Sequence, residues 1–296
     1  MGAASRRPAI APRADAEQAD HITALAVSYS GTPEDGMRPG FRMTIGADLG
    51  EVAGVHAAFA EFADAHAVPA SIRRSVNVVL DELLTNTISY GFAGRERGEV
   101  TIAVELRTDR LSVTLTDDGK PFDPFGMAAP DTAPSVEERR IGGLGIHLVR
   151  RMMDEVSYHR RADRNVVILA KLLTGGTTAG RGGGRSMDIT TRTRNDVALV
   201  AFAGNLDSNT SPRAQQALDA ILASGGRKMV VDFTALDYIS SAGLRVLLGT
   251  AKRLSGAGGA LHLCGLNETV QEVFDISGFS TILAVFATEA DALRGF

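Results

Sequence analysis

The sequence predicts an α+β two-layer sandwich followed by an α/β domain with a mixed sheet and helices. The chain has 296 residues, about twice the length of a typical domain. A Gly-rich stretch with six glycines in fourteen residues interrupts it at 174–187. Before this stretch, helical patterns precede paired strands, whereas after it strands and helices alternate. We therefore expect a flexible arm at 1–40, a first domain at 41–173, a linker at 174–187 and a second domain at 188–296.

Composition narrows the class of protein. Hydrophobic residues make up 44% of the chain and charged residues 22%, a balance that supports a packed core. The formal net charge of −4 disfavours direct binding of nucleic acid, because proteins that bind it are usually basic. A single cysteine, Cys264, leaves no partner for an internal disulfide. With no long apolar run and no signal pattern, we expect a cytoplasmic protein that does not bind membranes.

Helical spacing and strand alternation predict the elements of the first domain. In chain order, these are a helix beginning near Val52, a helix from Ala70 to Tyr90, strands at 100–106 and 111–117, a helix from the GGLG segment to Glu155, and a closing hairpin. Asp48 followed by Glu51 is typical of a capping box at the first of these helices. Helices on one side of the strands give the predicted sandwich.

The second domain alternates strands and helices. The pattern predicts a strand at 196–204, a helix capped by Ser211, a strand at 228–233, a helix at 242–255, a strand at 260–264, a helix at 267–277, and a last strand and helix. Pro212 would occupy the first position of its helix, where its missing N–H costs nothing. This order predicts a sheet with helices packed against it.

Glu82 and Asn86 are the first candidate functional pair. They are four residues apart on the second predicted helix, so they lie one turn apart on the same side, at the edge of its apolar face. Asp81 is expected to point toward solvent. An amide oxygen can bind Mg²⁺, and a carboxylate can deprotonate an attacking hydroxyl. The alternative is an ordinary polar edge of a helix.

Asp117 is the second candidate. Leu111, Val113 and Leu115 form the apolar face of their strand, and Asp117 continues that face at the strand's end. A buried carboxylate needs a hydrogen-bond donor, and the exocyclic amine of a purine is one. Gly119 would let a flat ring approach the backbone. The alternative is a turn aspartate satisfied by the amides of its own loop.

Three glycines open the helix that follows, in the segment IGGLGIHLVRRM. Gly142, Gly143 and Gly145 expose backbone N–H groups at a helix start, where the helix dipole favours phosphate. The segment matches neither the dinucleotide-binding glycine pattern nor the P-loop. By itself this is a weak signal.

The order of these motifs is more specific than any one of them. LDELLTNTISYGF, DDGKPFDP and GGLGIHLVRRMMDEVSY follow one another within the first domain. This series resembles the GHKL ATPase superfamily, and within it the anti-sigma-factor serine kinases, over about 41–173. The first motif resembles the N box of that family, and the other two resemble its glycine boxes.

The resemblance implies a site for ATP and Mg²⁺. It would make Glu82 the general base, Asn86 the magnesium ligand and Asp117 the partner of adenine, under a lid at 122–141. The glycines that would border the nucleotide are Gly119, Gly143 and Gly145.

The second domain contains VVDFTALDYISSAGLRVLL, which resembles the STAS domain of anti-sigma-factor antagonists. The family pattern of Asp-Ser-Ser/Thr-Gly-Leu aligns with residues 240–244 and places the phosphorylatable serine on Ser241. The sequence departs from the pattern at Ser240, where Asp is usual, and at Ala242, where Ser or Thr is usual. The alternative is that Ser241 only caps a helix.

Together the two resemblances imply a partner-switching regulator. Its kinase domain would be a protein serine/threonine kinase that transfers the γ-phosphoryl group of Mg-ATP to a serine of a STAS domain, in its own chain or in a separate antagonist. The implied partners are that STAS domain, a sigma factor and a second copy in a homodimer. The alternative function is a non-catalytic switch in which ATP or ADP occupancy decides which partner docks.

Overall fold

The computed structural model describes residues 28–30, 39–95, 97–126, 144–173 and 187–296. The predicted linker apart from Met187, most of the predicted arm and lid, and the glycines Gly142 and Gly143 lie outside these residues. Within the described parts, no helix is both long and apolar enough to cross a membrane.

The first domain is built on a six-stranded sheet of order β1-β2-β3-β4-β6-β5, in which every neighbouring pair is antiparallel. The strands are β1 (Ser28–Ser30), β2 (Gly40–Gly46), β3 (Glu99–Leu106), β4 (Arg110–Asp117), β5 (Glu155–Arg161) and β6 (Arg164–Leu172). β1 falls within the arm expected at 1–40. Ala162 and Asp163, both at positive φ, make the tight turn between β5 and β6.

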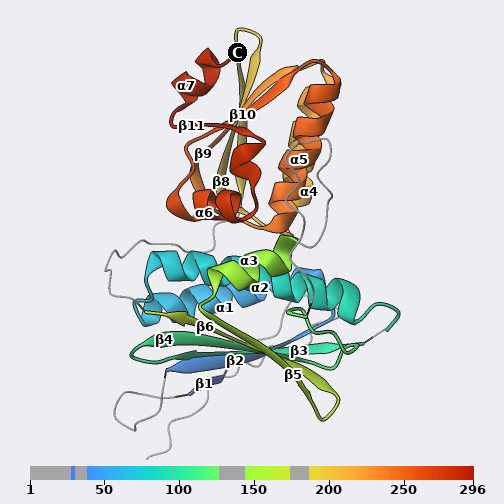
Figure 1. Cartoon of the computed structure of the whole chain (residues 1–296), viewed down its shortest axis with the longest axis vertical. Coiled ribbons are helices and arrows are strands. Elements are labelled where there is room, and N and C mark those ends of the chain that lie inside the picture. The colour runs from blue at the N-terminus through green and yellow to red at the C-terminus, as the bar shows by residue number, and fades with distance from the viewer. Residues whose placement is uncertain (1–27, 31–38, 96, 127–143, 174–186) are drawn as a thin grey trace, which may run out of the picture.

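Three helices cover one face of this sheet (Figure 1). They are α1 (Val52–Ala65), α2 (Ala70–Asn86) and α3 (Leu144–Met152). Alternate apolar residues of β4, among them Leu111 and Val113, are buried beneath the helices, as the strand pattern predicts. Burying each such side chain stabilises the fold by about 1.5–3 kcal/mol. An antiparallel sheet under helices confirms the predicted sandwich.

The start of α1 and the end of α2 differ in detail from the sequence prediction. Asp48 accepts a hydrogen bond from the N–H of Gly50 and caps a 3₁₀ turn, while the Glu51 carboxylate accepts from Gly46. The predicted capping box is therefore wrong, because Glu51 turns to the preceding strand. After Asn86, the chain continues into a π-helical turn, Thr87–Gly91, instead of a regular helix.

The second domain has a mixed five-stranded sheet of order β11-β10-β9-β8-β7. Its elements are β7 (Asp188–Arg194), β8 (Val197–Leu206), α4 (Ser211–Ala223), β9 (Lys228–Ile239), α5 (Ser241–Gly256), β10 (Ala260–Cys264), α6 (Glu268–Ile276), β11 (Ala284–Phe286) and α7 (Glu289–Arg294). Only β7 is antiparallel to its neighbour. The sequence prediction omits β7, whose polar residues are mostly exposed. The N-cap of α4 is Thr210 rather than Ser211.

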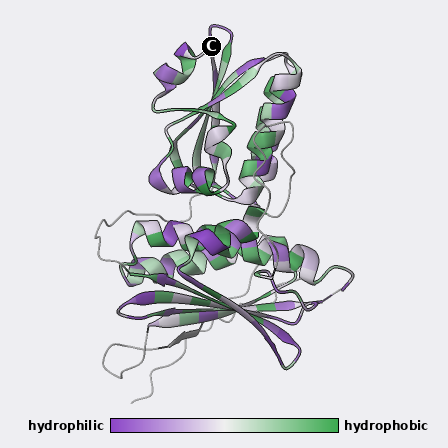
Figure 2. Ribbon diagram, viewed as in Figure 1, coloured by the Kyte–Doolittle hydropathy of each residue, from purple (hydrophilic) through white to green (hydrophobic). Residues whose placement is uncertain are grey.

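The second domain stands on the helical layer of the first (Figure 1). The parts that approach α2 and α3 are α6, the end of β9 and the start of α5. Figure 2 shows apolar residues concentrated along the strands and on the inner sides of the helices of both domains. The buried apolar residues of the two domains form one contiguous cluster, and the helical layer of the first domain contacts the loops that follow β8 and β9.

Candidate functional site

The contact between the domains brings two predicted site residues together. Glu82 lies on α2 and is 3% exposed, and Ser241 is the first residue of α5 and is also 3% exposed. The Ser241 hydroxyl donates a hydrogen bond to Glu82 Oε2 at 2.6 Å, and its backbone N–H donates to Oε1 at 2.5 Å. The predicted base therefore accepts both donors of the predicted phospho-acceptor.

Two helix N-termini converge on the Glu82 carboxylate. Ser241 places it at the start of α5, where the helix dipole favours a negative charge. Gly145, in the first turn of α3, lies against it on another side, and a Cβ built there would lie 2.0 Å from Glu82 Oε2. Only a glycine fits at position 145, because any side chain there would collide with the Glu82 carboxylate. This requirement is separate from the role of glycine at a helix start.

Arg245 completes the surroundings of the Ser241 hydroxyl. It lies one turn after Ser241 on α5, and its guanidinium donates a hydrogen bond to Ser241 Oγ at 3.0 Å. Sequence reasoning did not single out this residue, although its i+4 spacing from Ser241 was a usable signal. Its positive charge stands where a phosphate on Ser241 would need neutralisation.

The protonation of Glu82 is set by burial. Loss of water around the carboxyl, and next the negative charge of Asp81, raise the pKa of Glu82 from its ordinary value of 4.5 to about 7. The hydrogen bonds from Ser241 and the charge of Arg245 act in the opposite direction. A carboxyl with a pKa near neutrality can exchange a proton at physiological pH, as a general base requires.

Asp81 is buried, not solvent-facing as the sequence analysis expected. It is 1% exposed, because the second domain covers it. Ser208, in the loop after β8, donates its hydroxyl to Asp81 Oδ2 at 2.8 Å and itself accepts a bond from Thr85 at 3.0 Å. The expectation was wrong because it considered the first domain alone, whereas the partner of Asp81 is 127 residues away in the sequence.

Further polar groups surround Asp81. His56 Nε2, on α1, lies 4.0 Å from Asp81 Oδ1. On the side of the second domain, Asp207 accepts a hydrogen bond from the Tyr238 hydroxyl at 3.2 Å. Burial raises the pKa of the Asp81 carboxyl, and the charge of Asp207 adds to that rise, while His56 opposes it. The contact thus buries a set of polar groups contributed by both domains.

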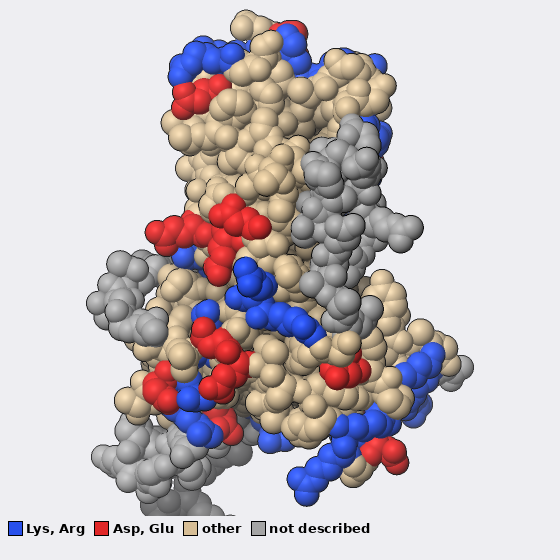
Figure 3. Space-filling model, in the orientation of Figure 1, with Lys and Arg blue, Asp and Glu red and all other residues tan. Residues whose placement is uncertain are grey.

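Charge complementarity extends to the rim of the contact. Acidic side chains at the lower edge of the second domain face basic side chains at the upper edge of the first (Figure 3). Exposed charges of this kind add little affinity but help to orient two surfaces. Within the contact, the Arg74 guanidinium of α2 donates to the hydroxyl of Thr269 of α6 at 2.7 Å, and Thr269 is 4% exposed.

Asp117 lies in a second polar group, at the end of β4. Its Oδ1 accepts bonds from the Gly119 N–H and from the Asn165 side chain, both at 2.8 Å. Asn165 lies opposite Asp117 in the register of β4 and β6 and is 4% exposed. Burial raises the pKa of the Asp117 carboxyl, and these two bonds lower it. We call Asp117, Gly119 and Asn165 the β4 corner.

The β4 corner is attached to the end of the helix that carries Glu82 and Asn86. The N–H of Lys120 donates to Gly91 O at 3.0 Å, and a Cβ on Gly119 would lie 2.7 Å from Asp117 Oδ1.

Asn86, the predicted magnesium ligand, is half-buried at the last turn of α2. No cluster of three or more His, Cys, Asp or Glu side chains able to hold a metal exists among the described residues. An amide oxygen together with phosphate oxygens is a donor set that suits Mg²⁺.

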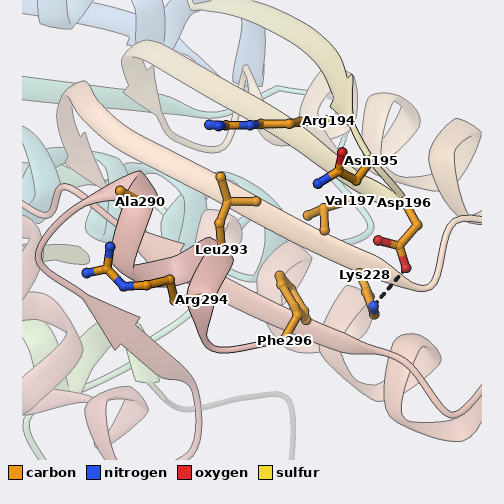
Figure 4. A pocket seen from close by; sticks show the side chains of 9 residues that line it. All are labelled: Arg194, Asn195, Asp196, Val197, Lys228, Ala290, Leu293, Arg294 and Phe296. Atoms are coloured by element: carbon orange, nitrogen blue, oxygen red, sulfur yellow. Dashed lines mark hydrogen bonds and ion pairs between the residues drawn. The ribbon is translucent and has the colours of Figure 1, made fainter.

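A pocket lies away from this contact. A cavity of about 400 Å³ lies at the opposite ends of β8 and β9, between the β7–β8 turn and α7 (Figure 4). Two of its three basic residues form ion pairs, Lys228 with Asp196 at 2.7 Å and Arg294 with Asp291. None of the predicted site residues lines it.

Comparison with known proteins finds two families in this chain. The family model of the histidine kinase-like ATPase domain matches residues 45–171, and the STAS domain model matches residues 188–292. The chain therefore joins a kinase-like ATPase domain, which implies ATP binding, to a STAS domain.

The relatives divide between the same two domains. The anti-sigma factor antagonist BtrV of Bordetella bronchiseptica is 40% identical over 100 residues, which cover 34% of this chain and 86% of BtrV. The chain thus belongs to the anti-sigma factor antagonist family through its STAS domain. The serine-protein kinase RsbW of Listeria monocytogenes is 31% identical over 97 residues, covering 31% of this chain and 62% of RsbW. The serine/threonine-protein kinase BtrW of Bordetella bronchiseptica is 28% identical over 100 residues, covering 34% and 70%.

Proposed function

We propose that this chain is an ATP-dependent protein serine kinase whose own STAS domain is a substrate, with Ser241 as the acceptor and Glu82 as the general base. One observation carries the proposal: the Ser241 hydroxyl donates a 2.6 Å hydrogen bond to Glu82 Oε2. A base that takes a proton must lie within hydrogen-bond reach of it. The names of RsbW and BtrW, which are protein kinases, support the same class of reaction.

The reaction would be an in-line phosphoryl transfer. Ser241 Oγ attacks the γ-phosphorus of ATP, the bond from that phosphorus to the bridging oxygen breaks, and ADP leaves. The hydroxyl proton passes to Glu82. Arg245, 3.0 Å from the acceptor oxygen, would balance the charge that the phosphate brings. Most of the acceleration in such reactions comes from positioning and electrostatics.

The β4 corner and Asn86 would hold the nucleotide. Asp117 would accept a hydrogen bond from the adenine amine, with Asn165 keeping its carboxylate in place. Gly119 would let its loop lie close to the Asp117 carboxylate, which a Cβ at this position would meet. Bound Mg²⁺ would neutralise phosphate charge, and the Asn86 amide oxygen would be its ligand from the protein.

Phosphorylation would also end the contact that permits it. The phosphate adds about −1.5 to −2 charges at neutral pH at a position that touches Glu82 and lies near Asp81. Like charges facing each other across an interface cost several kcal/mol. The modified STAS domain would therefore leave the kinase domain, whose exposed α2 surface could bind another partner. We propose a separate STAS antagonist or a sigma factor for that role.

Mass spectrometry of the intact chain after incubation with Mg-ATP tests the proposal. We expect a phosphate on Ser241, its loss in Ser241→Ala, and its retention in the matched control Ser240→Ala. A labelling rate that does not change when the protein is diluted would identify transfer within one chain.

Two results would contradict it. A label that persists in Ser241→Ala assigns the acceptor elsewhere. Normal ATP binding with no transfer, to this chain or to an added STAS protein, would favour the non-catalytic switch, because the buried contact at Glu82 would then serve docking alone.

A further inference from the structure

Ser240, the residue before the proposed acceptor, is fully buried in the domain contact. It is 0% exposed. Its backbone N–H donates to Leu206 O at 2.9 Å, but among the described residues its hydroxyl has no hydrogen-bond partner of ordinary geometry. Although it is the N-cap residue of α5, its side chain does not cap the helix. The hydroxyl is therefore tolerated here without being required by its own domain.

The group that faces Ser240 from the kinase domain is Asp81. The Ser240 hydroxyl lies close enough to lower the pKa of the Asp81 carboxyl. The hydrogen bonds of Asp81 come from the STAS domain: Ser208 Oγ at 2.8 Å and Ser208 N at 3.4 Å. Asp81 thus contacts the two loops that flank the acceptor, one after β8 and one after β9.

The charges around this position are mostly negative. Asp81, Glu82 and Asp207 lie around it, with the guanidinium of Arg245 bonded to the adjacent Ser241 hydroxyl. His56 Nε2, which has no hydrogen-bond partner among the described residues, is 4.0 Å from Asp81. A carboxylate brought to position 240 would lose its water and face Asp81, while the nearby guanidinium of Arg245 is already bonded to Ser241 Oγ. Buried like charges of this kind are strongly unfavourable.

We propose that Asp81 is a specificity-determining residue of the kinase domain, which accepts a STAS surface with a small neutral side chain before the acceptor serine and rejects one with an acidic side chain there. A hydroxyl at position 208 completes the surface that Asp81 accepts. The inference rests on the proposed function, since it names the feature that selects the substrate of that same site. It also gives the fused STAS domain an advantage over any separate STAS protein that carries a carboxylate at this position.

Charge reversal and rescue in the full-length chain test the inference. Four variants are compared: Ser240→Asp, the matched neutral variant Ser240→Asn, Asp81→Asn, and Asp81→Asn combined with Ser240→Asp. Two readouts are used. Hydrogen–deuterium exchange of peptides spanning 78–86 and 236–246 reports docking without ATP, and the rate of Ser241 phosphorylation by Mg-ATP reports transfer.

We expect Ser240→Asp to expose both peptides to exchange and to slow phosphorylation at least about tenfold relative to Ser240→Asn. In the Asp81→Asn background, the same Ser240→Asp change should slow phosphorylation by no more than about threefold, because the repelling carboxylate of Asp81 is gone. Comparing the acidic with the neutral variant separates charge from side-chain size.

Equal docking of Ser240→Asp and Ser240→Asn would overturn the inference, and so would a failure of Asp81→Asn to restore docking. Slower phosphorylation with unchanged exchange would also overturn it, because the effect would then lie in the chemical step. If wild type shows no phosphorylation at all but exchange follows the expected charge pattern, the docking specificity stands and the proposed function fails.

Discussion

The β4 corner and the domain contact satisfy their buried carboxylates in different ways. At the β4 corner, Asp117 finds its donors two residues ahead in its own loop and on the neighbouring strand. At the domain contact, Asp81 and Glu82 accept bonds from Ser208 and Ser241, 127 and 159 residues away. One group is closed within a domain, and the other exists only while two domains touch.

This difference separates a permanent site from a conditional one. The donors of Asp117 are fixed by strand pairing, so the β4 corner keeps its geometry whether or not the STAS domain is docked. Undocking would instead return Glu82 and Asp81 to water, which changes their pKa values and removes their hydrogen bonds. Nucleotide binding should therefore be separable from substrate binding, and variants at the two places should have distinct effects.

The largest effect is expected from a change at the domain contact. Glu82→Gln keeps an oxygen that can accept the Ser241 N–H but removes the base, so Ser241 phosphorylation should slow by about 10²–10⁴. Single-turnover labelling measures this rate, and calorimetry should show nearly unchanged ATP affinity. A rate within tenfold of wild type would remove Glu82 from the chemistry.

The second change breaks the β4 corner and leaves the contact intact. Asp117→Asn replaces an acceptor with a donor toward adenine, and we expect ATP binding to weaken by about 1–3 kcal/mol. Asp118→Asn is the matched control, because Asp118 is partly exposed and pairs with Arg95. Equal ATP affinity for Asp117→Asn and wild type in calorimetry would contradict the adenine assignment.

The same division explains how far sequence reasoning reached. Strand parity predicted that Asp117 continues a buried face, and helical spacing put Glu82 and Asn86 on one side of α2, because both arguments need only local geometry. Family resemblance supplied both domains and Ser241. Asn165 was missed, although its register opposite Asp117 follows once β4 and β6 are paired.

Local sequence patterns could not predict which surface of one domain contacts the other. Asp81 was predicted to face solvent because its direction on α2 leads out of the first domain's core. Nothing within the first domain indicates that a serine of the second domain will cover it. Ser208 was missed for the same reason, since its bond to Asp81 exists only through the contact, whereas Arg245 could have been found from its spacing to Ser241 on α5.

The smallest expected effect is a shift in pH dependence, and it sharpens the comparison because it belongs to the contact alone. Burial, and then the charge of Asp81, raise the pKa of Glu82 from 4.5 to about 7 in the docked state. As a general base, Glu82 must be ionised, so the rate of phosphorylation should rise with pH and reach half its maximum near pH 7.

The pH dependence of docking has the opposite sign. The docked state binds the Glu82 proton more tightly than the undocked state, so docking is most favoured below pH 4.5 and weakens as the pH rises toward 7. Asp81→Asn removes a neighbouring negative charge, so the half-maximum should move to lower pH. Labelling rates of wild type and Asp81→Asn between about pH 5.5 and 8.5, with ATP saturating, measure both midpoints; a flat profile, or a midpoint that moves upward in Asp81→Asn, would show that Glu82 does not set the pH dependence.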